Sequence, residues 1–288
     1  MALRSVLFLA AGALLVSAAP AACLSDAQAV ELVDSFFAKT PAPTPEGLSE
    51  EDGACSRRKV NNLLSLRHGA VVGYKAGLTN PAVQKRFGTD HPTWGVLYDG
   101  MLLPGGSTVD AAFGARPLFE ADLLVRVKSA AINHARTPAE VLDAIDQVIP
   151  FIELPDLVVQ APSKLNGAGV GAINVGARLG IVGQPLPVPA TRGERYALLD
   201  ALRDMTVRLT DGDGAELARG KGSDILGHPL EAVVWLAAAL QKEERTLEVG
   251  QLISLGSFSP LLPPRPGLRV NAHYDGLPAA VPVSVGFR

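Results

Sequence analysis

The stretch FEADLLVRV, residues 119–127, joins two acids to a run of valine and leucine. The apolar second half predicts a buried β-strand. Successive side chains of a strand alternate between its faces, so Glu120 and Asp122 point the same way. Two like charges side by side on a half-buried surface repel each other and are costly to desolvate.

A bound divalent cation would remove both difficulties, and a third acid stands in similar apolar surroundings at Glu153, in IPFIEL, residues 149–154. Three carboxylates, with water or substrate oxygens in the remaining positions, suit Mg²⁺ or Mn²⁺. The pattern therefore predicts a metal site at Glu120, Asp122 and Glu153. Acid-x-acid also occurs on edge strands with a solvated outer face, and this alternative stays open at the level of sequence.

The composition describes a folded chain without a strong charge bias. The 288 residues are 48% hydrophobic and 19% charged, with a net charge of −3, which gives no argument for nucleic acid or an acidic membrane surface as partner. The chain has 29 glycines and 22 prolines but only 5% aromatic residues. This composition favours many turns and short strands over a helical bundle.

The N-terminus has the features of a secretory signal peptide over residues 1–21. A short positive segment, Met1–Arg4, precedes the apolar run Val6–Val16 and the small-residue site Ala19–Ala21. We therefore expect an exported, periplasmic protein with no stable membrane insertion after cleavage. The alternative is an uncleaved N-terminal anchor.

The two cysteines, Cys23 and Cys55, both follow the expected cleavage site. In an oxidising compartment they can form one disulfide, which would tie the mature N-terminus to the segment before Lys59. The alternative is two free, partly buried thiols, and the sequence leaves both open.

The periodicity predicts an N-terminal helical region with a proline-rich linker over residues 22–70, followed by strands and helices to the C-terminus. We expect the basic residues Arg57–Lys59 to lie on a solvated helix face. The expected helices are 26–37, 49–66, 81–87, 137–148 and 229–240. The expected strands are 71–75, 95–98, 120–127, 207–210, 215–218, 251–255, 270–274 and 281–287.

Lys75 ends the apolar stretch VVGYK, residues 71–75. Burial makes a lysine a usable base or polar handle, so Lys75 is a candidate functional residue. An edge-strand lysine that discourages strand pairing is the alternative. The glycine-rich segment 161–171 lacks both the dinucleotide fingerprint and the phosphate-loop lysine, so we reject a nucleotide site there.

Seven segments carry a family resemblance: GYKAGLT (73–79), WGVLYDGM (94–101), EAD (120–122), VIPFIE (148–153), LGHPL (226–230), WLA (235–237) and GQLISLGSF (250–258). Taken in this order, they resemble the 2-keto-4-pentenoate hydratase branch of the fumarylacetoacetate hydrolase superfamily, from about residue 45 to the C-terminus. The resemblance implies an α+β fold, with a mixed β-sandwich or roll as the catalytic domain over 71–288 and a small helical N-terminal region.

The resemblance assigns roles to particular residues. It implies metal binding by Glu120, Asp122 and Glu153 and an acid–base role for Lys75. It also implies that the turn at 256–259 contacts the substrate carboxylate. These turn residues are Gly256, Ser257 and, where the family usually has threonine, Ser259. The activity implied is that of a carbon–oxygen lyase: hydration of a small unsaturated 2-oxo acid through a metal-stabilised enolate.

Two related reactions follow hydration in order of preference. Decarboxylation of an unsaturated 2-oxo diacid needs the same enolate. Hydrolytic carbon–carbon cleavage needs a His/Glu pair before Lys75, and the nearest histidine, His68, has no convincing partner. The family also implies a homodimer or a higher homo-oligomer. We expect His228, in Gly-His-Pro before a helix, to be a capping or core residue rather than a ligand.

Three positions depart from the family pattern. Thr93 replaces an acid, Asn166 lies near the family's Asp-Asn pair, and Leu118 stands where an arginine is common, with Arg116 displaced. Export is also unexpected for this chemistry of aromatic-compound catabolism. These departures motivate a rival of another class, a non-catalytic exported binding protein on the same scaffold.

Overall fold

The structure is a computed structural model that describes residues 22–288, so the expected signal peptide lies outside the described residues. Residues 22–288 form one sheet of eight strands and one of five, with helices packed around them. The helices are α1 (Asp26–Ala38), α2 (Glu50–His68), α3 (Pro81–Arg86), α4 (Pro138–Ala144), α5 (Gly167–Ala172), α6 (Arg192–Asp204) and α7 (Glu231–Lys242).

The strands of the large sheet are β1 (Val71–Gly77), β2 (Thr93–Tyr98), β3 (Leu102–Pro104), β5 (Glu120–Val127), β6 (Ile145–Leu154), β7 (Leu179–Val182), β8 (Leu186–Pro187) and β11 (Leu252–Ser254). The small sheet contains β4 (Thr108–Val109), β9 (Thr206–Asp211), β10 (Glu216–Lys221), β12 (Arg269–Asp275) and β13 (Val283–Phe287). Their order is β2-β1-β11-β5-β6-β7-β3, with β8 beside β6, and β10-β9-β12-β13-β4.

Strand β5 lies in the interior of the large sheet, between β11 and β6, and pairs antiparallel with both. In this register Glu120 lies directly opposite Glu153. Glu120, Asp122 and Glu153 are all buried. The alternative of a solvated edge strand at these acids is therefore wrong.

Strand β1 is also an interior strand, parallel to β11 and antiparallel to β2. Lys75 is buried and lies opposite Ser254 on one side and Gly95 on the other. Lys75 is thus not an edge lysine, and its burial needs a specific partner.

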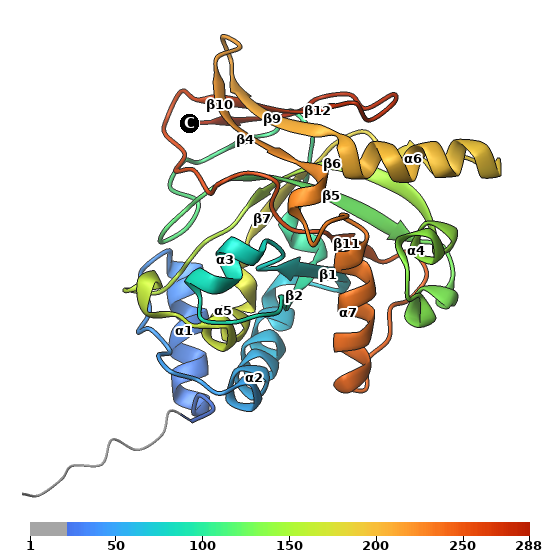
Figure 1. Cartoon of the computed structure of the whole chain (residues 1–288). Coiled ribbons are helices and arrows are strands. Elements are labelled where there is room, and N and C mark those ends of the chain that lie inside the picture. Colours follow the sequence, from blue (N-terminus) through green and yellow to red (C-terminus); the bar gives the residue numbers. More distant parts are fainter. Residues whose placement is uncertain (1–21) are drawn as a thin grey trace, which may run out of the picture.

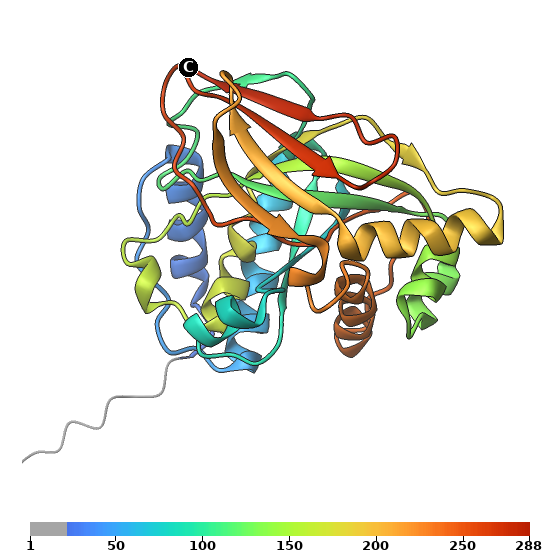
Figure 2. The same ribbon diagram turned by 45° about the horizontal axis from the view of Figure 1, so that its top comes forward.

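The two sheets pack against each other, which confirms the expected mixed β-sandwich or roll. Figure 2 shows strands of the small sheet crossing over those of the large sheet. Tyr274 of β12 links the two: its hydroxyl donates to the Asp122 carbonyl oxygen at 2.5 Å and accepts from the Phe151 N–H at 3.0 Å. The hydroxyl is therefore inserted into the β5–β6 pairing at the acid-bearing segment.

The N-terminal helices α1 and α2 lie together at one end of the molecule, near β1 and β2 (Figure 1). A disulfide joins Cys23 to Cys55, with 5.7 Å between their Cα atoms. The apolar faces of both helices belong to the same continuous core as the two sheets. The expected solvated face of α2 is wrong at one residue: Arg57 is buried, pairs with Glu243 and lies 3.8 Å over the Trp94 ring.

Most expected elements are present, with one clear exception. The predicted helix over 137–148 ends at Ala144, and residues 145–148 open strand β6 instead. Thr137 caps the helix start with Pro138 at its first position, as expected. Within residues 22–288, the helices are all too short or too polar to cross a membrane.

Candidate functional site

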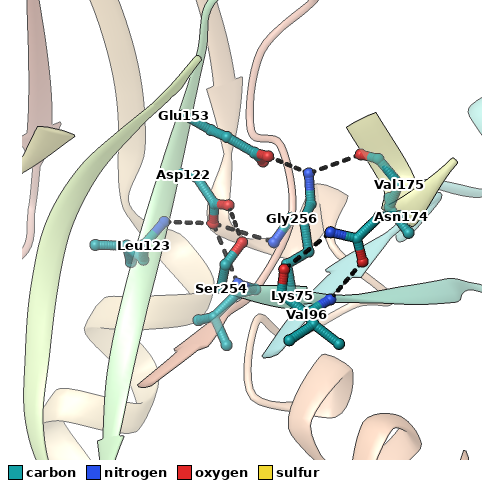
Figure 3. A network of polar contacts seen from close by, with 10 residues as sticks. Lys75, Val96, Asp122, Leu123, Glu153, Asn174, Val175, Ser254 and Gly256 are labelled. Carbon is teal, nitrogen blue, oxygen red and sulfur yellow. Dashed lines mark hydrogen bonds and ion pairs between the residues drawn. The ribbon is translucent and has the colours of Figure 1, made fainter. Parts of the chain in front are cut away.

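Lys75 and Glu153 form a buried ion pair at the centre of the large sheet, between strands β1 and β6 (Figure 3). The lysine ammonium also donates to the Val175 carbonyl oxygen at 3.0 Å. Glu120 stands next to Glu153 across the β5–β6 pair. The structure thus brings together three of the four charged residues that the sequence singled out.

Asp122, the fourth residue, turns its carboxylate toward β11. Its Oδ1 accepts N–H donors from Leu123, Leu255 and Gly256 at 2.6, 3.2 and 3.0 Å, and its Oδ2 accepts from the Ser254 hydroxyl. Figure 3 shows this carboxylate among its β11 partners, apart from the Lys75–Glu153 pair. Accordingly, within residues 22–288 no three acid, histidine or cysteine side chains already converge as a metal site.

Burial penalises the charged forms of Glu120 and Asp122. Burial, and next the charge of Glu153, raises the pKa of Glu120 well above its usual value. The same two causes raise the pKa of Asp122 to about 8. For Glu120, the Lys75 charge and the Ser257 hydroxyl oppose the shift, which also places Ser257 beside this carboxylate.

The donor set fits a hard divalent cation. Three buried carboxylates lie in the neighbourhood of one buried ammonium, so two negative charges have no cationic partner when all three acids ionise. Glu153 Oε2 is buried with no hydrogen-bond partner, and Asp122 Oδ2 has a single partner. Oxygen ligands of this kind suit Mg²⁺ or Mn²⁺, with Glu120 and Glu153 nearest to a suitable arrangement. The metal role of the three acids stays a prediction.

The predicted substrate-binding turn, residues 256–259, follows β11 and lies beside β5, the strand that carries Glu120 and Asp122. Phe258 N–H donates to the Ala121 carbonyl at 2.9 Å, and Ala121 N–H donates to the Ser259 hydroxyl at 3.1 Å. Gly256 uses its own N–H on Asp122. Ser257 is the turn residue that lies beside Glu120 and is half-buried. Contact of Gly256, Ser257 and Ser259 with a substrate stays a prediction.

The positions that depart from the family pattern take structural roles. Thr93 is buried on β2, opposite Gly77. Asn166 caps helix α5 by accepting from Gly169 N–H and donating to the Leu48 carbonyl. Arg116 donates to the Val159 and Gln160 carbonyl oxygens. None of their hydrogen bonds reaches Lys75 or the three acids.

The histidines also stay outside the site. His68 packs against the aromatic rings of Phe36, Phe37 and Tyr98, and burial lowers its pKa. His228 accepts from the N–H of Leu230, the residue before α7, and its other ring nitrogen lies 3.1 Å from the Leu199 carbonyl oxygen, so its bonds are to backbone groups.

Sequence reasoning missed several residues around the site. Ser254 and Thr79 have a weak signal, since each is a polar residue in or next to an apolar strand. Asn174, Val175 and Tyr274 have none that we could use, because their roles depend on backbone conformation and on contacts between distant elements.

Comparison with known proteins places these observations in a family. No family model matches the chain. The chain is 28% identical over 231 residues to 2-keto-4-pentenoate hydratase 1 of Dechloromonas aromatica, covering 80% of this chain and 84% of that protein. It is 30% identical over 211 residues to 4-oxalocrotonate decarboxylase of Pseudomonas sp. strain CF600, covering 73% and 76%.

A solved structure gives the same result for the fold. The 4-oxalocrotonate decarboxylase of Pseudomonas putida G7, complexed with magnesium and adipate, matches with a TM-score of 0.77 and 25% identity. The match covers 93% of this chain and 100% of that one. The chain therefore belongs to the 2-keto-4-pentenoate hydratase branch of the fumarylacetoacetate hydrolase superfamily, a branch of enzymes.

Proposed function

We propose that the chain is a divalent-metal-dependent lyase that hydrates a small unsaturated 2-oxo acid of the 2-hydroxypenta-2,4-dienoate type. The observation that carries the proposal is the buried ion pair of Lys75 with Glu153, directly opposite Glu120. A buried acid–base group beside surplus carboxylates matches the chemistry of 2-oxo acids, which chelate a cation and react through an enolate.

Glu120, Glu153 and Asp122 would hold Mg²⁺ or Mn²⁺. The bound cation would draw electron density from the 2-oxo and carboxylate oxygens of the substrate. Lys75 Nζ would move the proton that converts the 2-hydroxydienoate to its keto form. Ser257, next to Glu120, would orient the carboxylate end, and the apolar strands around the site would exclude bulk water.

Hydration of a monoacid is the first candidate because the buried cations of residues 22–288 are already paired. Arg57 pairs with Glu243, Lys75 with Glu153, and Arg178 with Asp156. A diacid would need a further cation for its second carboxylate.

Decarboxylation of an unsaturated 2-oxo diacid is the second candidate. It is favoured by the likeness to two 4-oxalocrotonate decarboxylases, one of them solved with the diacid adipate. A direct comparison separates the two: the purified mature protein with Mg²⁺ is given 2-hydroxypenta-2,4-dienoate or 4-oxalocrotonate, and substrate loss is followed by ultraviolet absorbance. Faster loss of the dienoate supports hydration; carbon dioxide release from the diacid reverses the order.

The rival, a non-catalytic binding protein, is tested by calorimetry with oxalate, a mimic of the chelating end of the enolate. We expect oxalate to bind only with metal, and not to bind to Glu120→Ala. Oxalate binding without turnover of either substrate would favour the rival. If no metal binds at all, the site prediction fails.

We also propose that the mature protein works after export. The Cys23–Cys55 disulfide supports this, since such bonds persist in oxidising compartments and are rare in the cytosol. Thiol labelling of the protein from periplasmic and cytoplasmic fractions, with mass determination of its N-terminus, tests the proposal. A reduced, full-length chain in the cytoplasm would contradict it. The functional molecule is expected to be a homodimer or higher homo-oligomer, which size-exclusion chromatography with light scattering measures.

A further inference from the structure

The turn Asn174–Gly176 has an unusual backbone. All three residues have positive φ, of 55° for Asn174, 54° for Val175 and 66° for Gly176. Glycine adopts this region freely and asparagine tolerates it, but a β-branched residue such as valine is rarely found there. Such strain persists only where the surrounding structure enforces it, and it concentrates at functional sites.

Val175 contacts β1 at two places. Its carbonyl oxygen accepts a hydrogen bond from the Lys75 ammonium at 3.0 Å. Its side chain lies over Gly77, where an added Cβ would come within 2.3 Å of Val175 Cγ1. A single residue in a strained conformation, Val175, therefore contacts both the ammonium of Lys75 and the backbone of Gly77.

Asn174 holds this turn in place because its side chain pairs with the backbone of β2, the edge strand of the large sheet next to β1. Its Oδ1 accepts from Val96 N–H at 2.7 Å, and its Nδ2 donates to the Val96 carbonyl at 3.0 Å (Figure 3). The side chain is 1% exposed, so both bonds are shielded from water.

We propose that Asn174 is a positioning residue for Lys75. By pairing with Val96 it keeps the Val175 carbonyl aimed at the ammonium, and this carbonyl and Glu153 take two of its three N–H bonds. The third N–H is left for the substrate in a fixed direction. The inference rests on the proposed function in one respect, namely that Lys75 moves a proton.

Asn174→Ala is the test variant, and Asn133→Ala is its matched control. Asn133 is also buried, and its amide makes the same two bonds to a backbone: from Leu247 N–H at 2.8 Å and to the Leu247 carbonyl at 2.9 Å. Neither Asn133 nor Leu247 is a hydrogen-bond partner of Lys75. Both variants therefore lose the same kind of bonds, but only one loosens the lysine.

The first readout is the steady-state rate of dienoate hydration with saturating Mg²⁺, per active site titrated with oxalate. We expect Asn174→Ala to lower kcat by about a hundredfold while KM and oxalate affinity change little, because misplacing a reacting group affects the chemical step. We expect Asn133→Ala to keep kcat close to that of the parent. An equal kcat loss in both variants, or none in Asn174→Ala, would overturn the inference.

The second readout does not need turnover. Metal-free protein is acylated with acetic anhydride, and Lys75 modification is measured by peptide mass spectrometry against the exposed lysines of the same sample. We expect Lys75 modification to rise about tenfold in Asn174→Ala, equivalent to about 1.4 kcal/mol, and to stay at the parental level in Asn133→Ala. Unchanged Lys75 modification in Asn174→Ala contradicts the positioning role.

The two readouts separate the inference from the reaction on which it rests. If the parent turns over no 2-oxo acid but Lys75 modification rises only in Asn174→Ala, the proposed reaction fails and the positioning of Lys75 stands. Should the alanine variant not fold, Asn174→Asp replaces it, with Asn133→Asp as control. The aspartate keeps the acceptor for Val96 N–H and loses the donor, so the same changes are expected with smaller size.

Discussion

Gly256 shows how closely backbone segments approach one another beside the site. Its φ is 102°, and an added Cβ would come 2.2 Å from the Thr79 hydroxyl oxygen. Its N–H donates to Asp122 at 3.0 Å. Glycine is therefore required here by conformation and by space, apart from any contact with a substrate.

Gly256→Ala is expected to lower the free energy of unfolding by about 3 kcal/mol, from backbone strain and overpacking against Thr79. Gly227→Ala is the control, since Gly227 has φ of 83° and no atom within 4 Å of its added Cβ. It should lose only about 1 kcal/mol, from strain alone. Urea unfolding measures both, and equal losses would show that Thr79 does not restrict the site.

Because of the buried acids, we expect the folding stability of the metal-free protein to fall as pH rises. The folded-state pKa of Asp122 is raised to about 8, and that of Glu120 is raised as well, so the folded state binds more protons than the unfolded chain. This stability is fully present below the unfolded pKa of about 4 and is lost as pH rises through the folded value.

Urea unfolding in EDTA should therefore show falling stability from about pH 5 to about pH 8, by up to about 1.4 kcal/mol per pH unit for each proton involved. Added Mg²⁺ should flatten this slope, because a bound cation takes the place of the protons. Stability that rises over this window without metal would contradict the burial of the acids.

Among single residues, the sequence predicted the charged ones that interrupt an apolar strand pattern. Lys75, Glu120, Asp122 and Glu153 interrupt apolar strands, and all four are buried in the structure. Asn174 and Val175 could not be predicted, because a positive φ in non-glycine residues is imposed by the packing around them. The direction of the Asp122 carboxylate likewise depends on hydrogen bonds from Ser254 and Leu255, which lie 132 and 133 residues further along the chain.

At the scale of elements, the β5–β6 pair depends on a side chain from the other sheet. The Tyr274 hydroxyl accepts from the Phe151 N–H and donates to the Asp122 carbonyl within the pairing, in a buried position. Without this hydroxyl, both groups would lose a buried hydrogen-bond partner.

Tyr274→Phe is expected to lower the free energy of unfolding by about 2 kcal/mol, the cost of leaving buried polar groups unpaired. Tyr196→Phe is the control, because Tyr196 is 51% exposed. Hydrogen exchange at the Phe151 amide should also become faster in Tyr274→Phe alone. An unchanged stability and exchange rate would mean that the β5–β6 pairing closes without the hydroxyl.

The element that sequence reasoning misjudged shows the limit of periodicity. Residues 138–154 run from a capped helix into a strand without a glycine or a turn between them. Apolar residues suit either state there, so the boundary at Ala144 has no local marker. What decides it is pairing with β5, a contact between segments about 20 residues apart that periodicity does not report.

At the scale of the whole molecule, the local sequence pattern could not predict the order of the strands in the large sheet. Strand β11 lies between β1 and β5 although it comes far later in the chain, and this order brings Ser254 and Gly256 to Asp122. The resemblance of several collinear segments implied the fold class correctly. The division at residue 70 stays a prediction, although α1 and α2 share one core with the sheets.

The disulfide is expected to contribute about 3 kcal/mol to stability, because it closes a loop between residues 32 apart and restricts the unfolded chain. Thermal unfolding with and without dithiothreitol measures this contribution. The double variant Cys23→Ser/Cys55→Ser is the control, which should match the reduced parent and not respond to the reductant. An identical melting temperature of oxidised and reduced parent would contradict the expectation.

The same bond changes what a cut in the chain means. The covalent ring from Cys23 to Cys55 includes α1 and the connecting segment, in which Glu46 and Gly47 are exposed. A protease that cleaves at these two residues opens the ring but releases no fragment, since α1 remains attached to α2 through sulfur. On a denaturing gel such a nicked chain migrates as one species until it is reduced, and the fragment that contains α1 then separates from the rest.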